Sequence, residues 1–113
     1  MEFDSNKPIW LQIYNTICEQ ILSGNFPPGG RIPSVREYGA EIGVNPNTVM
    51  RTYEKLTGEG IIFNKRGIGY FVVEDAATTI KTAQRKAFME NEVPAFIRRM
   101  KLLGIEPDEI KLK

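Results

Sequence analysis

The sequence predicts a mainly α-helical protein with one small β-hairpin, and three observations support this prediction. Apolar residues recur every three or four positions along most of the 113-residue chain, as they do on the buried face of an amphipathic helix. Serine, asparagine, proline and glycine stand where such helices would begin and end. Residues 61–73 instead form two runs rich in β-branched and aromatic residues around a glycine-containing turn, which is typical of a hairpin.

Composition limits the classes of function. A chain of 113 residues has room for one full domain with a modest core, and 42% hydrophobic with 26% charged residues is ordinary for a folded protein. The chain has no histidine and a single cysteine, which excludes a disulfide framework and a Cys/His zinc site and removes the usual general base. The acidic residues form no calcium-binding loop. We therefore expect no enzymatic activity, no metal and no cofactor.

Charge and hydropathy bear on location and partners. No apolar run approaches the roughly 20 residues that a membrane-spanning helix needs, and the start MEFDSNKPIW lacks the plan of a signal peptide. We therefore expect a cytoplasmic protein that does not enter a membrane. The net charge is only +1, so any surface that binds nucleic acid has to be a local patch.

The first predicted helix covers residues 8–23. Ile9, Ile13, Ile17 and Ile21 recur every four residues and would form its buried stripe. Proline suits the first turn of this helix and glycine its end, as at positions 8 and 24. Cys18 falls beside the stripe, so we expect this thiol to pack in the core rather than to react.

The second and third predicted helices meet at a short turn. Ser34 and Glu37 have the S-x-x-E spacing of a capping box, so a helix over residues 34–42 should start there and end at Gly43. Asn45 and Pro46 then suit the cap and the first residue of the next helix, which runs to about residues 58–60. Two helices joined by a turn of this length form a helix-turn-helix, and the following hairpin completes a winged helix-turn-helix.

A second helical region follows residue 75. Its apolar residues are three or four apart, and Pro94 must either kink the helix or mark the start of a new one. One more short helical turn is expected within residues 107–113. The apolar stripe needs a partner, so we expect residues 75–113 to form a dimerisation region attached to the winged helix-turn-helix at residues 7–74. The alternative is that these helices fold back on their own domain. The candidate dimer-interface residues are Phe88, Phe96, Ile97 and Met100.

The motifs PGGRIPSVREYGAEIGVNPNTVMRTYEKLTGEGII and GIGYFVV resemble the GntR family of bacterial transcription regulators, over roughly residues 7 to 74. The short helical remainder is similar to the small YtrA-type branch. This resemblance implies a dimeric repressor that binds an inverted-repeat operator in double-stranded DNA, often near a transporter operon. The chain departs from the family at Gly39, where alanine is usual, at Met50, where a polar or basic residue is common, and at Ile68 on the wing tip.

The third helix begins with short polar side chains, as expected if its amino end lies in a DNA major groove. Asn47 can pair with adenine, Thr48 can offer its hydroxyl to a base or a phosphate, and Met50 can contact a thymine methyl group. Capping alone explains Asn45. The candidate DNA-binding residues are Arg31, Arg36, Asn45, Asn47, Thr48, Met50, Arg51, Lys65, Arg66, Gly67 and Gly69.

The arginines, lysines and glycines in this set are expected to contact the DNA backbone or grooves, and the arginines also have alternative roles. By the resemblance, Arg36 and Arg51 would hold phosphates or guanine, and the alternative for each is a solvated surface arginine. Arg31 could contact a phosphate or form a salt bridge within its loop. Lys65 and Arg66 would suit the minor groove, and the wing glycines would allow a close approach of the backbone. Residues 31–70 carry six cations against four anions, a net charge of +2.

Two other functions compete with DNA binding. A winged-helix protein-interaction module without DNA binding would expose apolar anchors, and Met50 and Ile68 give it some support. A small enzyme is disfavoured by the missing histidine. The polar start of the third helix and the basic wing favour DNA.

Overall fold

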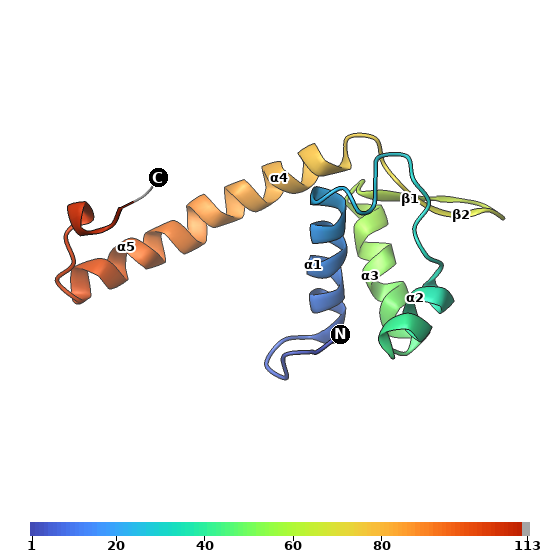
Figure 1. Ribbon diagram of the computed structural model, residues 1–113, viewed down its shortest axis with the longest axis horizontal. Coiled ribbons are helices and arrows are strands. Elements are labelled where there is room, and N and C mark those ends of the chain that lie inside the picture. The colour runs from blue at the N-terminus through green and yellow to red at the C-terminus, as the bar shows by residue number, and fades with distance from the viewer. Residues whose placement is uncertain (112–113) are drawn as a thin grey trace. The chain divides into compact units, whose positions relative to one another are not determined.

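The computed structural model describes residues 1–111 and divides the chain into two compact units, Met1–Ile80 and a second unit that begins at Lys81. The first unit contains α1 (Ile9–Leu22), α2 (Val35–Ile42), α3 (Pro46–Gly58), β1 (Ile62–Lys65), β2 (Gly69–Val72) and the first turn of α4 (Ala76–Ala87) (Figure 1). The second unit contains the rest of α4, a π-helical turn (Phe88–Glu92), α5 (Val93–Leu102) and a 3-10 turn (Pro107–Glu109). The predicted winged helix-turn-helix with a C-terminal helical region is confirmed.

Local caps set the helix boundaries of the helix-turn-helix, as the sequence predicted. The Ser34 Oγ accepts a hydrogen bond from the Glu37 backbone N–H at 3.1 Å, and the Glu37 carboxylate accepts one from the Ser34 N–H at 3.0 Å. Gly43 ends α2 in the left-handed conformation, with φ of 73°. The Asn45 Oδ1 accepts from the Asn47 N–H at 2.8 Å and caps α3, in which Pro46 is the first residue.

The turn between α2 and α3 also explains Gly39. A Cβ at this position would lie 2.7 Å from the carbonyl oxygen of Val44, which is closer than a carbon and an oxygen can approach without a shift of the backbone. The Val44 N–H in turn donates to the Gly39 carbonyl at 2.9 Å. Glycine therefore lets the turn pack directly on α2, at a cost in helix propensity of up to about 1 kcal/mol.

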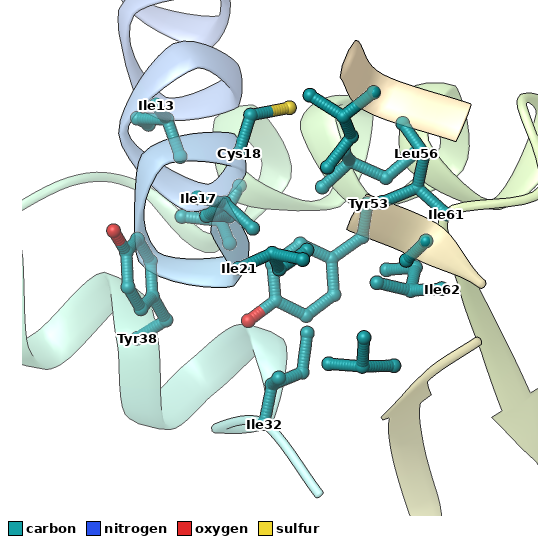
Figure 2. Close-up of a cluster of buried hydrophobic side chains, with 14 residues drawn as sticks. Ile13, Ile17, Cys18, Ile21, Ile32, Tyr38, Tyr53, Leu56, Ile61 and Ile62 are labelled. Atoms are coloured by element: carbon teal, nitrogen blue, oxygen red, sulfur yellow. The ribbon is translucent and has the colours of Figure 1, made fainter. Parts of the chain in front are cut away.

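The core of the first unit forms where α1, α3 and the hairpin meet (Figure 2). Ile13, Ile17, Cys18 and Ile21 are buried as predicted, but Ile9 is 43% exposed, so the buried stripe of α1 begins one turn later than expected. Burial raises the pKa of the Cys18 thiol to about 11, and the thiol therefore stays protonated at neutral pH. The other fully buried side chains include Ile32, Val49, Thr52, Tyr53, Leu56, Ile62 and Val72.

The wing contains more than the predicted hairpin. Its two strands are antiparallel, with Ile62 opposite Val72 and Lys65 opposite Gly69. A bridge from Arg31 to Phe71 adds a short third segment on the other side of β2, and the Ile32 N–H donates to the Tyr70 carbonyl at 3.0 Å. This segment could not be predicted from local patterns, because residues 24–33 have only loop character.

In the second unit, Pro94 falls in the first turn of α5, and the backbone stays helical through the π-helical turn that joins α4 to α5. Since proline has no N–H, the carbonyl four residues earlier, that of Glu90, lacks its helical partner. A π-helical turn precedes it, in which the Val93 N–H donates to the Phe88 carbonyl, five residues back. Gly104, with φ of 70°, ends α5. The predicted final turn is present as a 3-10 turn, and residues 112–113 of that prediction lie outside the described residues.

None of the helices within residues 1–111 has the length and the apolar character that crossing a bilayer requires.

Candidate nucleic-acid interface

Helix α3 has one buried and one outward face. A helix turns by about 100° per residue. Four residues of α3 face the core, so the residues on the opposite side of the helix point away from the protein. The buried residues are Val49, Thr52, Tyr53 and Leu56, and the outward residues are Asn47, Met50, Arg51 and Glu54. The outward face thus carries an amide, a thioether, a guanidinium and a carboxylate within two turns of the helix start.

The amino end of α3 presents Asn47 but not its neighbours. The Asn47 side chain is exposed and makes no hydrogen bond to any residue in the described range 1–111. By contrast, the Asn45 side chain accepts the capping hydrogen bond, as expected. Thr48 was expected on the exposed face, but it is half-buried, because it lies to one side of the outward face and next to Val49. Asn47 is therefore the best-placed side chain for a base edge.

Met50 of α3 lies next to the wing. It is 37% exposed, and its Sδ is 3.9 Å from the hydroxyl of Tyr70 on β2. Tyr70 also packs edge-on against the buried ring of Tyr53, with ring centroids 5.0 Å apart. These contacts fix the position of the wing relative to the outward face of α3.

The two arginines near α2 are only weakly engaged within the protein. Arg36 is exposed, and no ion pair within residues 1–111 includes it. An Nη of Arg31 is 3.9 Å from the Glu37 carboxylate, and both side chains are more than half exposed, so this pair contributes little. The pKa of Glu37 is lowered mainly by the Ser34 backbone and hydroxyl hydrogen bonds, and only to a lesser extent by Arg31.

Arg31 instead packs against the wing. A Cβ added at Gly69 would lie 2.9 Å from the Nε of Arg31, so only glycine leaves room for the guanidinium there. The φ of Gly69, 144°, also disfavours any other residue. The room at Gly69 is therefore taken up by a side chain of the protein itself.

The tip of the wing carries the remaining candidates. The Nζ of Lys65 is 4.8 Å from the centroid of the Phe71 ring, which places this cation along the hairpin. Arg66, Gly67 and Ile68 are exposed, Ile68 by 61%. Gly67 has φ of 80°, and the Ile68 N–H closes the turn by donating to the Lys65 carbonyl at 2.9 Å. The tip thus combines two cations with one apolar side chain.

The second unit exposes the residues proposed for a dimer interface. Phe88 is 51%, Phe96 55% and Ile97 44% exposed, and Met100 is half-buried. Three of them, Phe96, Ile97 and Met100, line a groove of about 630 Å³ against the chain that follows α5. Its other lining residues are Lys101, Gly104, Ile105, Glu106 and Pro107. Met89 and Leu102, for which no interface role was expected, are also exposed.

Two residues near the interface were missed by sequence reasoning. Glu54 lies on the outward face of α3, which helical spacing alone would have revealed. Trp10 has its ring 5.1 Å from the Cζ of Arg51, a contact between α1 and α3 that no local pattern indicates.

Within residues 1–111 there is no cluster of acidic or cysteine side chains suited to a metal ion.

Comparison with known proteins agrees with this geometry. Residues 10–72 match the family described as "Bacterial regulatory proteins, gntR family". The chain is 36% identical over 109 residues to the HTH-type transcriptional regulator YhcF of Bacillus subtilis, covering 96% of this chain and 88% of YhcF. It is 45% identical over 76 residues to the HTH-type transcriptional repressor YtrA of the same organism, covering 67% of this chain and 58% of YtrA.

Solved structures extend the likeness to DNA-bound proteins. A GntR-family protein of Bacteroides thetaiotaomicron superimposes with a TM-score of 0.75 at 46% identity, covering 89% of this chain and 87% of that one. The DNA-binding domain of AraR, solved in complex with the operator ORR3, superimposes with a TM-score of 0.58 at 27% identity. That match covers 65% of this chain and 86% of the AraR domain.

Proposed function

Because this chain belongs to the GntR family of bacterial regulatory proteins and is of the YtrA type, we propose that it is a dimeric repressor that binds an inverted-repeat operator in double-stranded DNA. DNA-binding transcriptional regulation is common to the family and to the relatives described above. The observation that carries the finer proposal is the outward face of α3. It presents Asn47 and Arg51 without hydrogen-bonded partners among residues 1–111.

In this proposal α3 lies with its amino end in the major groove, and the wing lies along the backbone or the minor groove. Asn47 pairs with adenine, Arg51 with guanine, and Met50 contacts a thymine methyl group. Thr48 is placed for a phosphate, because only part of its side chain is accessible.

Phosphates are neutralised by four cations, namely Arg31, Arg36, Lys65 and Arg66. The backbone at Gly67 approaches the DNA closely. Asn45 contributes through its cap, and Gly69 through the room that it leaves for Arg31.

The proposed dimer forms through residues 75–113, while residues 7–74 bind DNA. Exposed Phe88, Phe96 and Ile97 support this proposal, since large apolar side chains left in water favour association. Met100 would complete the interface. Two-fold symmetry would place the two α3 helices about 34 Å apart, one turn of DNA, on the half-sites of an inverted repeat.

The regulated genes are proposed from the resemblance alone. YtrA-type regulators often control transporter operons, and we propose the same for this protein, acting in the cytoplasm where bacterial operators lie. A protein-interaction module without DNA binding is the second candidate, because Ile68 is 61% exposed at the wing tip.

Selection of binding sites from random double-stranded DNA tests the proposal. The expected product is an inverted repeat whose half-site centres are about 10 base pairs apart. If no sequence is enriched, and if the protein binds duplex DNA no more tightly than an Asn47→Ala and Arg51→Ala double variant does, the regulatory proposal fails and the interaction module gains support.

A further inference from the structure

Trp10, at the start of α1, makes two contacts with the recognition helix. Its backbone carbonyl accepts a hydrogen bond from the hydroxyl of Thr52 at 2.8 Å, and Thr52 is fully buried. Its ring centroid lies 5.1 Å from the Cζ of Arg51, the preceding residue of α3. Figure 1 shows the amino ends of α1 and α3 at the same end of the first unit. Two successive residues of α3 therefore hold the first turn of α1.

Arg51 is not engaged by the nearby carboxylates. Glu54 lies one turn further along α3, yet the ion pairs found within residues 1–111 are Arg31 with Glu37 and Lys55 with Glu59. No hydrogen bond from the Arg51 guanidinium is found among those residues either. A guanidinium on an aromatic ring uses its flat face, while its N–H donors point outward from the edge. The contact with Trp10 therefore restrains Arg51, and no hydrogen bond among residues 1–111 occupies its donors.

We infer that Trp10 is a positioning residue for DNA recognition, which holds the Arg51 guanidinium so that its N–H fork faces a guanine in the major groove. The inference rests on the proposed function and adds to it the base that this position selects. Guanine offers O6 and N7 to a planar fork, and the pairing is bidentate. A side chain that is already oriented loses less conformational entropy on binding. Trp10 thereby raises affinity and guanine preference without touching a base.

A purely structural role explains Trp10 less well. Its side chain is only half-buried, and it belongs neither to the buried core cluster nor to the partly buried residues packed against that cluster in the described part of the chain. The hydrogen bond to Thr52 uses the backbone carbonyl, so it survives any substitution of the ring. A change of the side chain should therefore leave the fold in place and act on Arg51.

A double-mutant cycle tests the inference, with an operator selected from random duplexes by the unsubstituted protein. Arg51→Ala should weaken operator binding by about tenfold. Trp10→Ala should weaken it by about two- to fivefold, and should lower the preference for guanine at the base pair that Arg51 contacts. Adding Trp10→Ala to Arg51→Ala should cause no further loss. Trp10→Phe, which keeps an aromatic face, should restore most of the affinity that alanine removes.

Three results would overturn the inference while leaving the proposed function intact: equal effects of Trp10→Ala with and without Arg51, equal loss of affinity for operator and unrelated DNA, or no rescue by phenylalanine. Thermal melting of each variant controls for folding, and an unchanged base preference in a fully folded Trp10→Ala protein counts against the inference. If the unsubstituted protein enriches no sequence, the proposed function fails and the inference fails with it.

Discussion

The ring of Tyr53 packs edge-on against the ring of Tyr70, with centroids 5.0 Å apart and planes at 82°. Tyr53 is fully buried on α3, and Tyr70 lies on β2, so this pair joins the recognition helix to the wing. The Tyr53 hydroxyl also donates to the carbonyl of Pro33 at 2.7 Å, just before α2. One side chain thus connects all three segments that are proposed to touch DNA.

Tyr53→Phe should reduce the free energy of unfolding by about 1–2 kcal/mol, because it removes the donor that satisfies the Pro33 carbonyl. Tyr70→Phe is the matched control. The Tyr70 hydroxyl is exposed and has only the Met50 sulfur at 3.9 Å, so its loss should change stability by less than about 0.5 kcal/mol. Urea unfolding followed by circular dichroism measures both. Equal losses in the two variants would show that the buried hydrogen bond has no special role.

The capping box should make stability depend on pH. The Ser34 hydrogen bonds hold the pKa of Glu37 below its ordinary value of 4.5. Because the pKa is lower in the folded state, ionised Glu37 stabilises the fold above about pH 4.5, and this contribution is lost as the pH falls through the folded-state pKa. Glu37→Gln keeps a capping side chain but does not titrate.

The unfolding free energy of the unsubstituted protein should therefore fall more steeply than that of Glu37→Gln between about pH 5 and pH 3. Glu54→Gln serves as the control, because the Glu54 carboxylate accepts no hydrogen bond among residues 1–111 and its loss removes the same charge. Acid titration at several urea concentrations gives the three curves. Parallel curves for Glu37→Gln and the unsubstituted protein would contradict the capping account.

Binding to the operator should weaken strongly with salt. If four cations of each subunit neutralise phosphates, a dimer makes about eight such contacts, and log K should fall against log salt with a slope of about −7. Arg36→Ala removes two contacts from the dimer and should bring the slope closer to zero by about 2. Lys55→Ala should leave it unchanged, because Lys55 is paired with Glu59 at 3.3 Å. Fluorescence anisotropy would measure the slopes, and a slope near zero for the unsubstituted protein would argue against phosphate binding.

The proposed dimer can be broken from one face of α5. Phe96→Glu places a charge beside Ile97 and Met100 in the apolar groove, and should yield a monomer at micromolar concentration. Leu102→Glu is a matched control, because Leu102 is 85% exposed and lies on the opposite side of α5 from this groove. Light scattering after size exclusion measures the mass. A monomeric unsubstituted protein, or a dimer that tolerates Phe96→Glu, would contradict the proposed interface.

The features that sequence predicted well are those with local causes. The capping box at Ser34, the cap at Asn45 and the left-handed Gly43 each depend on a few consecutive residues, and all are present. Buried Val49 and Leu56 followed from helical spacing for the same reason.

The features that were missed depend on contacts between distant segments. The third segment of the wing sheet at Arg31 requires hydrogen bonds to β2, about forty residues further along the chain. The contact of Trp10 with Arg51 likewise joins α1 to α3. For Pro94, local chemistry predicted a break but left open whether the helix would kink or restart, because the π-helical bonding before it depends on the surrounding chain.

The central claim is that the amino end of α3 reads base edges, and Asn47 tests it most directly. Binding sites should be selected from random duplexes by the unsubstituted protein and by Asn47→Ala, each confirmed as folded by its thermal melting curve. We expect the unsubstituted protein to prefer adenine at one base pair of each half-site and Asn47→Ala to accept any base there, with about 1–3 kcal/mol of discrimination lost. Identical selected sequences for the two proteins would contradict the account.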